Sequence, residues 1–218
     1  TGKSERYSRY LIKKIKEALN YDFTKVVGCL VTHEHGDHNK SIKDVLSIGI
    51  DVFASKGTLE ASGVLEHHKS NVIQSKKVYH IGNFKIIPFD VKHDVREPLG
   101  FLINHPQTGT TLFLTDTFYS PYKFQGLNNL IIEANFCEEI IDRKLKADKK
   151  FLRDRVLKSH LSIQKCIDLL NANDLTKVNN IVLIHLSDSN SNELEFKTKV
   201  ENATGKNVVV ANDNLEIN

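Results

Sequence analysis

The sequence predicts an α/β fold in which strands and helices alternate along most of the chain. Short apolar runs recur with the length and the β-branched content of buried strands. Segments with helical spacing of apolar residues lie between several of them. No Gly-x-Gly-x-x-Gly loop and no P-loop follows any of these strands. Nothing in the sequence therefore favours dinucleotide binding or Walker-type phosphate binding.

Length and composition fit one globular unit. The chain has 218 residues, of which 40% are hydrophobic and 26% are charged, which is enough to build one large core. We therefore expect a single domain over residues 1–218, with residues 1–22 as an atypical N-terminal segment. No apolar run approaches the roughly 20 residues of a membrane helix, and the first residues are polar. We expect a cytoplasmic protein with no membrane partner.

The first part of the chain predicts a βαβ unit. Apolar spacing and Gly49, which favours a helix end, define its helix. A further helix precedes the unit and another follows it. In chain order, we expect a helix at Arg9–Leu19, a strand at Val26–Val31, a helix around Ile42–Ile48, a strand at Asp51–Ala54 and a helix at Thr58–His67.

The rest of the chain changes character and predicts successive strands with turn signals between them. A long helical stretch separates the fifth of these strands from the sixth, and Ser162 is the candidate N-cap of its last helix. The expected strands are Lys77–Ile81, Phe84–Lys92, Gly100–Asn104, Thr111–Thr115, Leu130–Glu133, Ile181–His185 and Val208–Ala211.

The most informative segment is a cluster of histidines and carboxylates directly after the first expected strand. His33, His35, Asp37 and His38 form a His-x-His-x-Asp-His pattern. Alternate positions point toward one cavity and the last two toward a neighbouring position, which suits two adjacent metal ions. These donors match zinc, and also manganese or iron. The competing interpretation is a histidine-rich solvated loop.

Three further candidate ligands each end a predicted strand. They are His93, Asp116 and His185. A single histidine at a strand end is more often a hydrogen-bonded core or rim residue. Three such residues together with the first motif favour a common metal site.

With this motif and the three later residues at strand ends, the chain resembles the metallo-β-lactamase fold superfamily. The resemblance implies a four-layer αβ/βα sandwich with two divalent metal ions, zinc foremost and manganese or iron as alternatives. It also implies N-terminal strands that residues 1–20 do not supply, so we expect those strands to be missing or truncated. The ligands implied are His33, His35 and His93 for the first metal, Asp37, His38 and His185 for the second, and Asp116 as the bridge.

Two short segments are similar to those of metal-dependent nucleases. Leu130–Asn135 resembles the Glu-Ala motif, and Ser159–Ser162 the His-x-Ser/Thr motif, of the RNase Z-like and YycJ-like branches. The resemblance implies that His160, held by Glu133, protonates the leaving oxygen, while Asp37 belongs to the catalytic centre. The competing interpretation is a surface glutamate and a histidine in the first turn of a helix.

Other segments resemble the YycJ-like branch more closely than the transfer-RNA processing enzymes. They are His160-Leu161-Ser162, Ile184–Ser187, and His93-Asp94 followed by Pro98-Leu99-Gly100. The resemblance implies hydrolysis of a phosphodiester by a DNA exonuclease, with nucleic acid as the partner and DNA favoured over RNA. Two adjacent dications activate a water molecule for such a reaction. The sequence specifies no oligomeric state.

A basic run lies just before His160. Net charge is only +3, which does not imply a nucleic-acid partner by itself, but basic residues outnumber acidic ones between Arg143 and Lys158. The run is either a solvated helix face or a surface that contacts phosphates. The candidate substrate-binding residues are Lys149, Lys150, Arg153, Arg155 and Lys158.

Three other functions stay open at this stage. A thioester or lactone hydrolase of the glyoxalase type shares the metal set, and the Glu133–His160 pair argues against it. A lactam-cleaving enzyme is disfavoured because such relatives often use a cysteine ligand, and Cys29, Cys137 and Cys166 lie in no metal motif. We expect these cysteines to be buried reduced thiols. A nonenzymatic metal-stabilised scaffold would need no acid pair.

Aromatic residues cluster after Asp116 in the sequence. They either stack on nucleobases or pack a loop, and the sequence does not decide between the two. The residues are Phe118, Tyr119, Tyr122 and Phe124.

Overall fold

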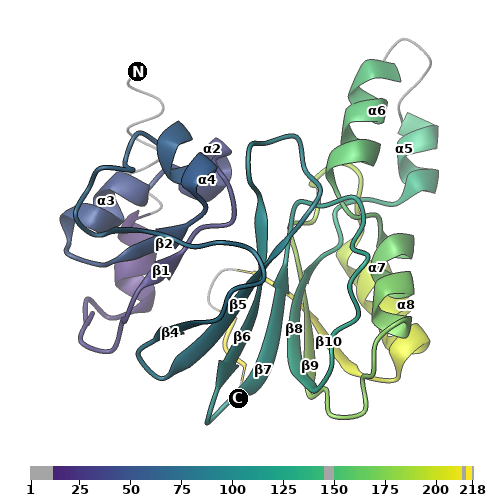
Figure 1. Ribbon diagram of the computed structural model, residues 1–218. Helices are drawn as coiled ribbons and strands as arrows, with labels where there is room; N and C mark the ends of the chain where they lie inside the picture. Colours follow the sequence, from purple (N-terminus) through teal and green to yellow (C-terminus); the bar gives the residue numbers. More distant parts are fainter. Residues whose placement is uncertain (1–11, 145–149, 213–214, 218) are drawn as a thin grey trace.

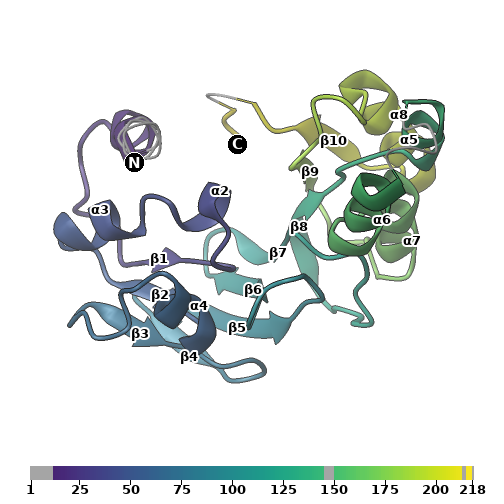
Figure 2. The same ribbon diagram turned by 90° about the horizontal axis from the view of Figure 1, so that it is seen from above.

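A computed structural model describes residues 12–144, 150–212 and 215–217. Two β-sheets face each other, with helices on their outer sides (Figures 1 and 2). This arrangement confirms the predicted four-layer αβ/βα sandwich. The elements are β1 (Cys29–Leu30), α2 (Gly36–Asn39), α3 (Ile42–Ser47), β2 (Val52–Ala54), α4 (Lys56–Ala61), β3 (Ser70–Val72), β4 (Tyr79–Ile81), β5 (Phe84–Asp90), β6 (Leu99–His105), β7 (Gly109–Leu114), β8 (Leu127–Glu133), α5 (Glu138–Lys144), α6 (Lys150–Ser159), α7 (Ile163–Asn171), β9 (Asn180–Ile184), α8 (Glu193–Thr204) and β10 (Asn207–Val210).

The small sheet has the order β1-β2-β3, and its strands are parallel. The predicted βαβ unit is therefore confirmed. Strand β1 is shorter than the predicted Val26–Val31, because it pairs with β2 alone and β2 has only three residues. Close packing also shapes this region: a Cβ on Gly28 would lie 2.6 Å from the ring of Phe53.

The helices of this half differ from the prediction at their ends. Gly49 has a φ of +89°, which suits the predicted end of α3. Helix α4 ends at Ala61 instead of His67, because Gly63 takes a left-handed φ of +65° just after it. Strand β3 was missed, since Ser-Asn-Val carries little apolar pattern.

The N-terminal prediction is confirmed where the structure describes it. Residues 12–18 are helical, while the first residues of the predicted Arg9–Leu19 helix lie outside the described part. No strand occurs among residues 12–28.

The large sheet has the order β10-β9-β8-β7-β6-β5-β4. Strands β4 to β7 pair antiparallel, whereas β7 to β10 pair parallel. Its outer face packs on α7 and α8 through buried residues such as Leu130, Cys166 and Phe196. Because parallel strands end at the same sheet edge, the residues after β7, β8 and β9 meet there.

Of the helices in this half, α7 begins as the sequence predicts, whereas α8 was not predicted. Ser162 caps α7, and its Oγ accepts a hydrogen bond from the backbone N–H of Lys165 at 3.3 Å. Helix α8 was not predicted, because Phe196 and Val200 are its only buried residues and the rest of the helix is largely polar.

The cysteines are thiols, as expected from the sequence. All three cysteines are free thiols; Cys137 and Cys166 are buried, and Cys29 is half-buried. Among the described residues, no helix combines the length and the apolar character needed to cross a membrane.

Candidate metal centre

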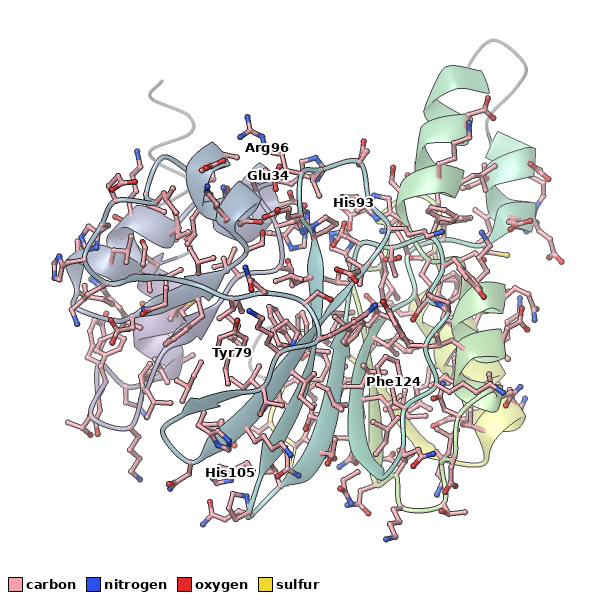
Figure 3. The ribbon with its side chains drawn as sticks, viewed as in Figure 1. Glu34, Tyr79, His93, Arg96, His105 and Phe124 are labelled. Carbon is pink, nitrogen blue, oxygen red and sulfur yellow. The ribbon has the colours of Figure 1, made fainter. Side chains whose placement is uncertain are left out.

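Three imidazoles from two loops form a compact group, and Figure 3 shows one of them, His93, near the upper edge of the sheets. His33 and His35 follow β1, and His93 follows β5. Their ring centroids are 4.8 to 5.0 Å apart, and the Nε2 atom of His93 lies 3.0 Å from the Nδ1 atom of His35. One ligand atom from each lies within 4.8 Å of the others, so the three side chains could hold one metal ion.

A second group lies next to the first. Asp37 and His38 begin helix α2, and His185 follows β9. An Oδ atom of Asp37 lies 3.4 Å from the Nε2 atom of His38 and 3.6 Å from that of His185. These three donors also satisfy the spacing of a metal site.

Asp116 lies between the two groups. Its Oδ2 atom is 3.1 Å from the Nε2 atom of His38, and its Oδ1 atom is 3.8 Å from the Nε2 atom of His93. Thr115 donates a hydrogen bond to Oδ2 at 2.7 Å. The carboxylate thus lies within 3.8 Å of imidazoles of both groups, which is the placement that a bridging ligand needs.

Two of these side chains stand on left-handed backbone. The φ angles are +50° at Asp116 and +58° at His185, a region that non-glycine residues rarely adopt. Both residues directly follow the apolar cores of parallel strands. The sharp turns aim the two side chains across the sheet edge, and strain of this kind concentrates at functional sites.

Glu133 makes a contact that the sequence did not reveal. The Nδ1–H of His160 donates to its Oε1 atom at 2.8 Å, as expected for the predicted pair. The Nδ1 atom of His185 also lies 2.9 Å from the same oxygen. The other oxygen, Oε2, accepts the backbone N–H groups of Leu161 at 3.1 Å and Thr117 at 3.4 Å. The carboxylate is fully buried.

The pKa values in this region reflect burial and close contact. Burial acts to raise the pKa of Glu133, but the hydrogen bonds from His160 and His185 outweigh it, and that pKa lies below its ordinary value. Burial and the neighbouring imidazoles lower the pKa of His33 to about 2. Burial acts to lower the pKa of His185, but the hydrogen bond to Glu133 and the charge of Asp116 raise it to about 9.

The donor atoms fit metal ions better than they fit one another. The Nε2 atom of His33 is buried and has no hydrogen-bond partner among the described residues, and that of His38 makes no aligned hydrogen bond although Asp116 lies 3.1 Å away. Leaving a buried polar atom unpaired costs roughly 1–3 kcal/mol, and coordination of a cation would remove that cost. All seven predicted ligands therefore lie where metal binding would satisfy them; their role as ligands stays a prediction.

Several neighbouring groups that sequence reasoning missed orient the predicted ligands. The Nδ1–H of His93 donates to the backbone carbonyl of Ser159 at 2.9 Å. Asn135 donates to the carbonyl of His185 at 2.7 Å. Both contacts join residues distant in sequence, and neither side chain carries a spacing that predicts them.

Glu34 belongs to the histidine-rich motif but not to the metal groups. Its Oε1 atom accepts the backbone N–H of Arg96 at 3.0 Å. Figure 3 shows Glu34 beside Arg96 at the upper rim, in the same region as His93. This bond ties the loop after β1 to the loop that carries His93.

Helix α6 holds most of the candidate substrate-binding residues. It stands above the edge of the large sheet on the same side as the metal groups (Figure 1) and ends one residue before His160. Lys158 is exposed. Lys149 lies outside the described residues, and the side chains of Lys150, Arg153 and Arg155 are not among those described.

The chain is similar to known proteins in sequence and in structure. No protein-family model matches the chain. The chain is 30% identical over 153 residues to the exodeoxyribonuclease YycJ of Bacillus anthracis, a match that covers 64% of this chain and 54% of that protein. The chain thus spans about half the length of the curated relative it matches.

Solved structures match over most of the chain. The metallo-β-lactamase fold protein YhfI from Bacillus subtilis aligns with a TM-score of 0.63, at 15% identity, over 88% of this chain and 79% of that one. The metallo hydrolase Igni18 from Ignicoccus hospitalis aligns with a TM-score of 0.60, at 14% identity, over 88% and 80%. A diphosphatase of the PhnP family aligns with a TM-score of 0.60, at 17% identity, over 92% and 73%. The chain therefore has the metallo-β-lactamase fold, and within that fold its sequence resembles the YycJ-like branch.

Proposed function

We propose that the chain is a metal-dependent phosphodiesterase of the DNA exonuclease type. The observation that carries the proposal is the 2.8 Å hydrogen bond between His160 and Glu133, placed against the group of predicted metal ligands. The similarity to an exodeoxyribonuclease supports the same reaction. Nucleic acid is then the substrate, and DNA is favoured over RNA.

The predicted ligands would hold two divalent cations. His33, His35 and His93 would bind one, and Asp37, His38 and His185 the other, with Asp116 shared. Two cations bound there would lower the pKa of water and offset the charge of the phosphate. Imidazole and carboxylate donors suit zinc, with manganese or iron as alternatives.

His160 would protonate the leaving oxygen. Its side chain is 22% exposed, so one edge of the ring reaches solvent while Nδ1 lies on Glu133. Its Nδ1 atom also lies 3.3 Å from Asp116. With Nδ1 held by Glu133, Nε2 is the ring atom that would donate a proton to the leaving oxygen. A sugar oxygen is a poor leaving group, so this donation is what a phosphodiester requires.

Helix α6 would bind the substrate backbone. Its last residue, Ser159, lies next to His160 and contacts His93 through its carbonyl. Basic side chains on this helix, together with Lys149 before it, would lie beside the phosphates that flank the scissile bond. The proposed residues are Lys149, Lys150, Arg153, Arg155 and Lys158.

A thioester or lactone hydrolase is the competing outcome. A thiolate leaves readily without a proton, so thioester hydrolysis has little use for a buried glutamate holding a histidine, whereas a lactone releases an alkoxide that needs the proton. The same metal groups would serve both reactions. The acid pair is therefore the feature that an experiment must address.

The decisive comparison is wild type against His160→Ala. Both proteins are given end-labelled single- and double-stranded DNA and RNA, and a thioester. We expect the variant to keep its metal content, measured by mass spectrometry, and to lose about 10²–10⁴-fold in turnover of phosphodiesters. His105→Ala is the matched control, since His105 lies at the opposite end of the sheet (Figure 3). Unchanged cleavage by His160→Ala, or cleavage of the thioester alone, contradicts the proposal.

A further inference from the structure

A cavity of about 230 Å³ lies between the loop that follows β7 and helix α7. The loop connects the parallel strands β7 and β8. Leu161 and residues of α7 form the other side of the cavity. Residues that line the cavity include Tyr119, Ser120, Tyr122, Leu161, Lys165 and Asp168.

Both walls are held in place by contacts outside the cavity. The backbone N–H of Phe124 donates to the side-chain oxygen of Asn173 at 2.6 Å, which fastens the loop to the end of α7. The rings of Phe89 and Phe124 pack at 4.9 Å, and Tyr122 packs on Phe89 at 5.6 Å. Figure 3 shows Phe124 well below His93, at the lower part of the loop. The cavity is therefore formed before any ligand enters.

The cavity adjoins the candidate active site through the chain itself. The loop begins directly after Asp116, the proposed bridging ligand. Leu161, which lines the cavity, directly follows His160, the proposed acid. Its backbone N–H binds Glu133. Chain neighbours of both Asp116 and His160 therefore contribute to the cavity or to its loop.

The wall chemistry combines an aromatic face with positive charge. Tyr119 is 51% exposed although its neighbours are packed. The ammonium of Lys165 lies 5.6 Å from the ring centre of Phe118, and Lys123 also lines the cavity. Asp168 supplies an acceptor for an amino group. A purely apolar acyl chain would use neither the ammonium groups nor the carboxylate.

We propose that this cavity binds the nucleobase of the nucleotide that carries the leaving oxygen. The base stacks on Tyr119, while Lys123 and Lys165 face the adjacent phosphate. This inference rests on the proposed nuclease function and adds a subsite to it. Stacking on an aromatic side chain tolerates every base, so the subsite would bind this nucleotide whichever base it carries.

Binding is tested without cleavage. A short single-stranded DNA that carries 2-aminopurine is titrated into the protein in EDTA, and the fluorescence of the base reports its stacking. We expect quenching with wild type, about tenfold weaker binding by Tyr119→Ala, and recovery in Tyr119→Phe, which keeps the ring. Tyr21→Ala is the control, because Tyr21 is 63% exposed and follows the first helix. Equal affinity of wild type and Tyr119→Ala overturns the subsite.

A second measurement separates the subsite from the reaction. DNA with one abasic nucleotide on the leaving side of the scissile bond is compared with DNA abasic on the other side. With wild type, we expect DNA that is abasic on the leaving side to raise KM about tenfold. With Tyr119→Ala, the same substrate should have little effect on KM. The same KM for both substrates with wild type overturns the subsite, although the enzyme is a nuclease. Quenching without any metal-dependent cleavage overturns the nuclease function and leaves the base-binding cavity standing.

Discussion

Glu133 and His185 are joined by a hydrogen bond of 2.9 Å between Oε1 and Nδ1. The same oxygen contacts His160 at 2.8 Å. One buried carboxylate therefore orients both a predicted metal ligand and the proposed acid. Carboxylates that hold a ligating histidine fix its ring and raise its basicity, so the proposed metal binding and proton donation would both depend on one side chain.

Glu133→Gln tests this shared role. The amide keeps the size of the side chain but loses its charge, so both histidines lose an anionic partner. We expect metal affinity to fall about 10–100-fold, together with a loss of turnover at saturating metal. Isothermal titration with zinc and a cleavage assay measure the two effects. His160→Ala is the comparison: it should lose turnover only, and an unchanged metal affinity in Glu133→Gln would sink the shared role.

Asp116→Asn tests the bridging position. Asparagine tolerates the left-handed backbone at this residue, so the change removes charge without adding strain. We expect at least about tenfold weaker metal binding, and metal content measured after dialysis should fall. Asp90→Asn, which changes an exposed carboxylate on β5, is the control. Full retention of both ions in Asp116→Asn would contradict bridging.

Metal removal should destabilise the folded chain. The buried Nε2 atom of His33 has no partner among the described residues, and only the folded state brings the ligands together. Zinc at about a thousand times its Kd would add roughly 4 kcal/mol. Thermal unfolding with and without EDTA measures this, and an identical Tm in both conditions would count against a preformed site.

The core of the large sheet should be sensitive to truncation. Leu130 is fully buried on β8, between the parallel strands that carry the site. Leu130→Ala should lower the free energy of unfolding by about 2–5 kcal/mol. Leu194→Ala is the matched control, since Leu194 is 75% exposed. Urea denaturation of both variants measures the difference, and equal midpoints would argue against this packing.

The cysteines should differ in reactivity. Burial raises the pKa of the Cys166 and Cys29 thiols above their ordinary values, and the thiolate is the reactive form. We expect iodoacetamide to label half-buried Cys29 slowly in the native protein. Cys137 and Cys166 should react only after unfolding. Peptide mass spectrometry identifies each site, and rapid labelling of native Cys166 would contradict its burial.

The sequence predicted the parts of the fold that depend on local patterns. His93, Asp116 and His185 each follow an apolar strand, and parallel strands end at a common edge, so their convergence could be expected. The His33–His38 motif is contiguous and needs no tertiary information. The Ser162 cap likewise follows from residues close in sequence.

Other features depend on partners that the sequence does not identify. The length of β1 is set by its three-residue neighbour β2. Helix α8 buries few side chains, so its apolar pattern is weak. The second contact of Glu133 requires knowing how far the turn at His185 carries its ring, which is a matter of backbone angle and not of residue type.

The hydrogen bond from His93 to the carbonyl of Ser159 has a mechanical consequence. It fastens the last turn of α6 to a loop from the other side of the sheet edge. A polyanion that binds α6 and shifts it would therefore also shift His93, an imidazole of the first metal group. Binding of a nucleic-acid strand to α6 would therefore also align the proposed reactive centre, because this hydrogen bond links the two.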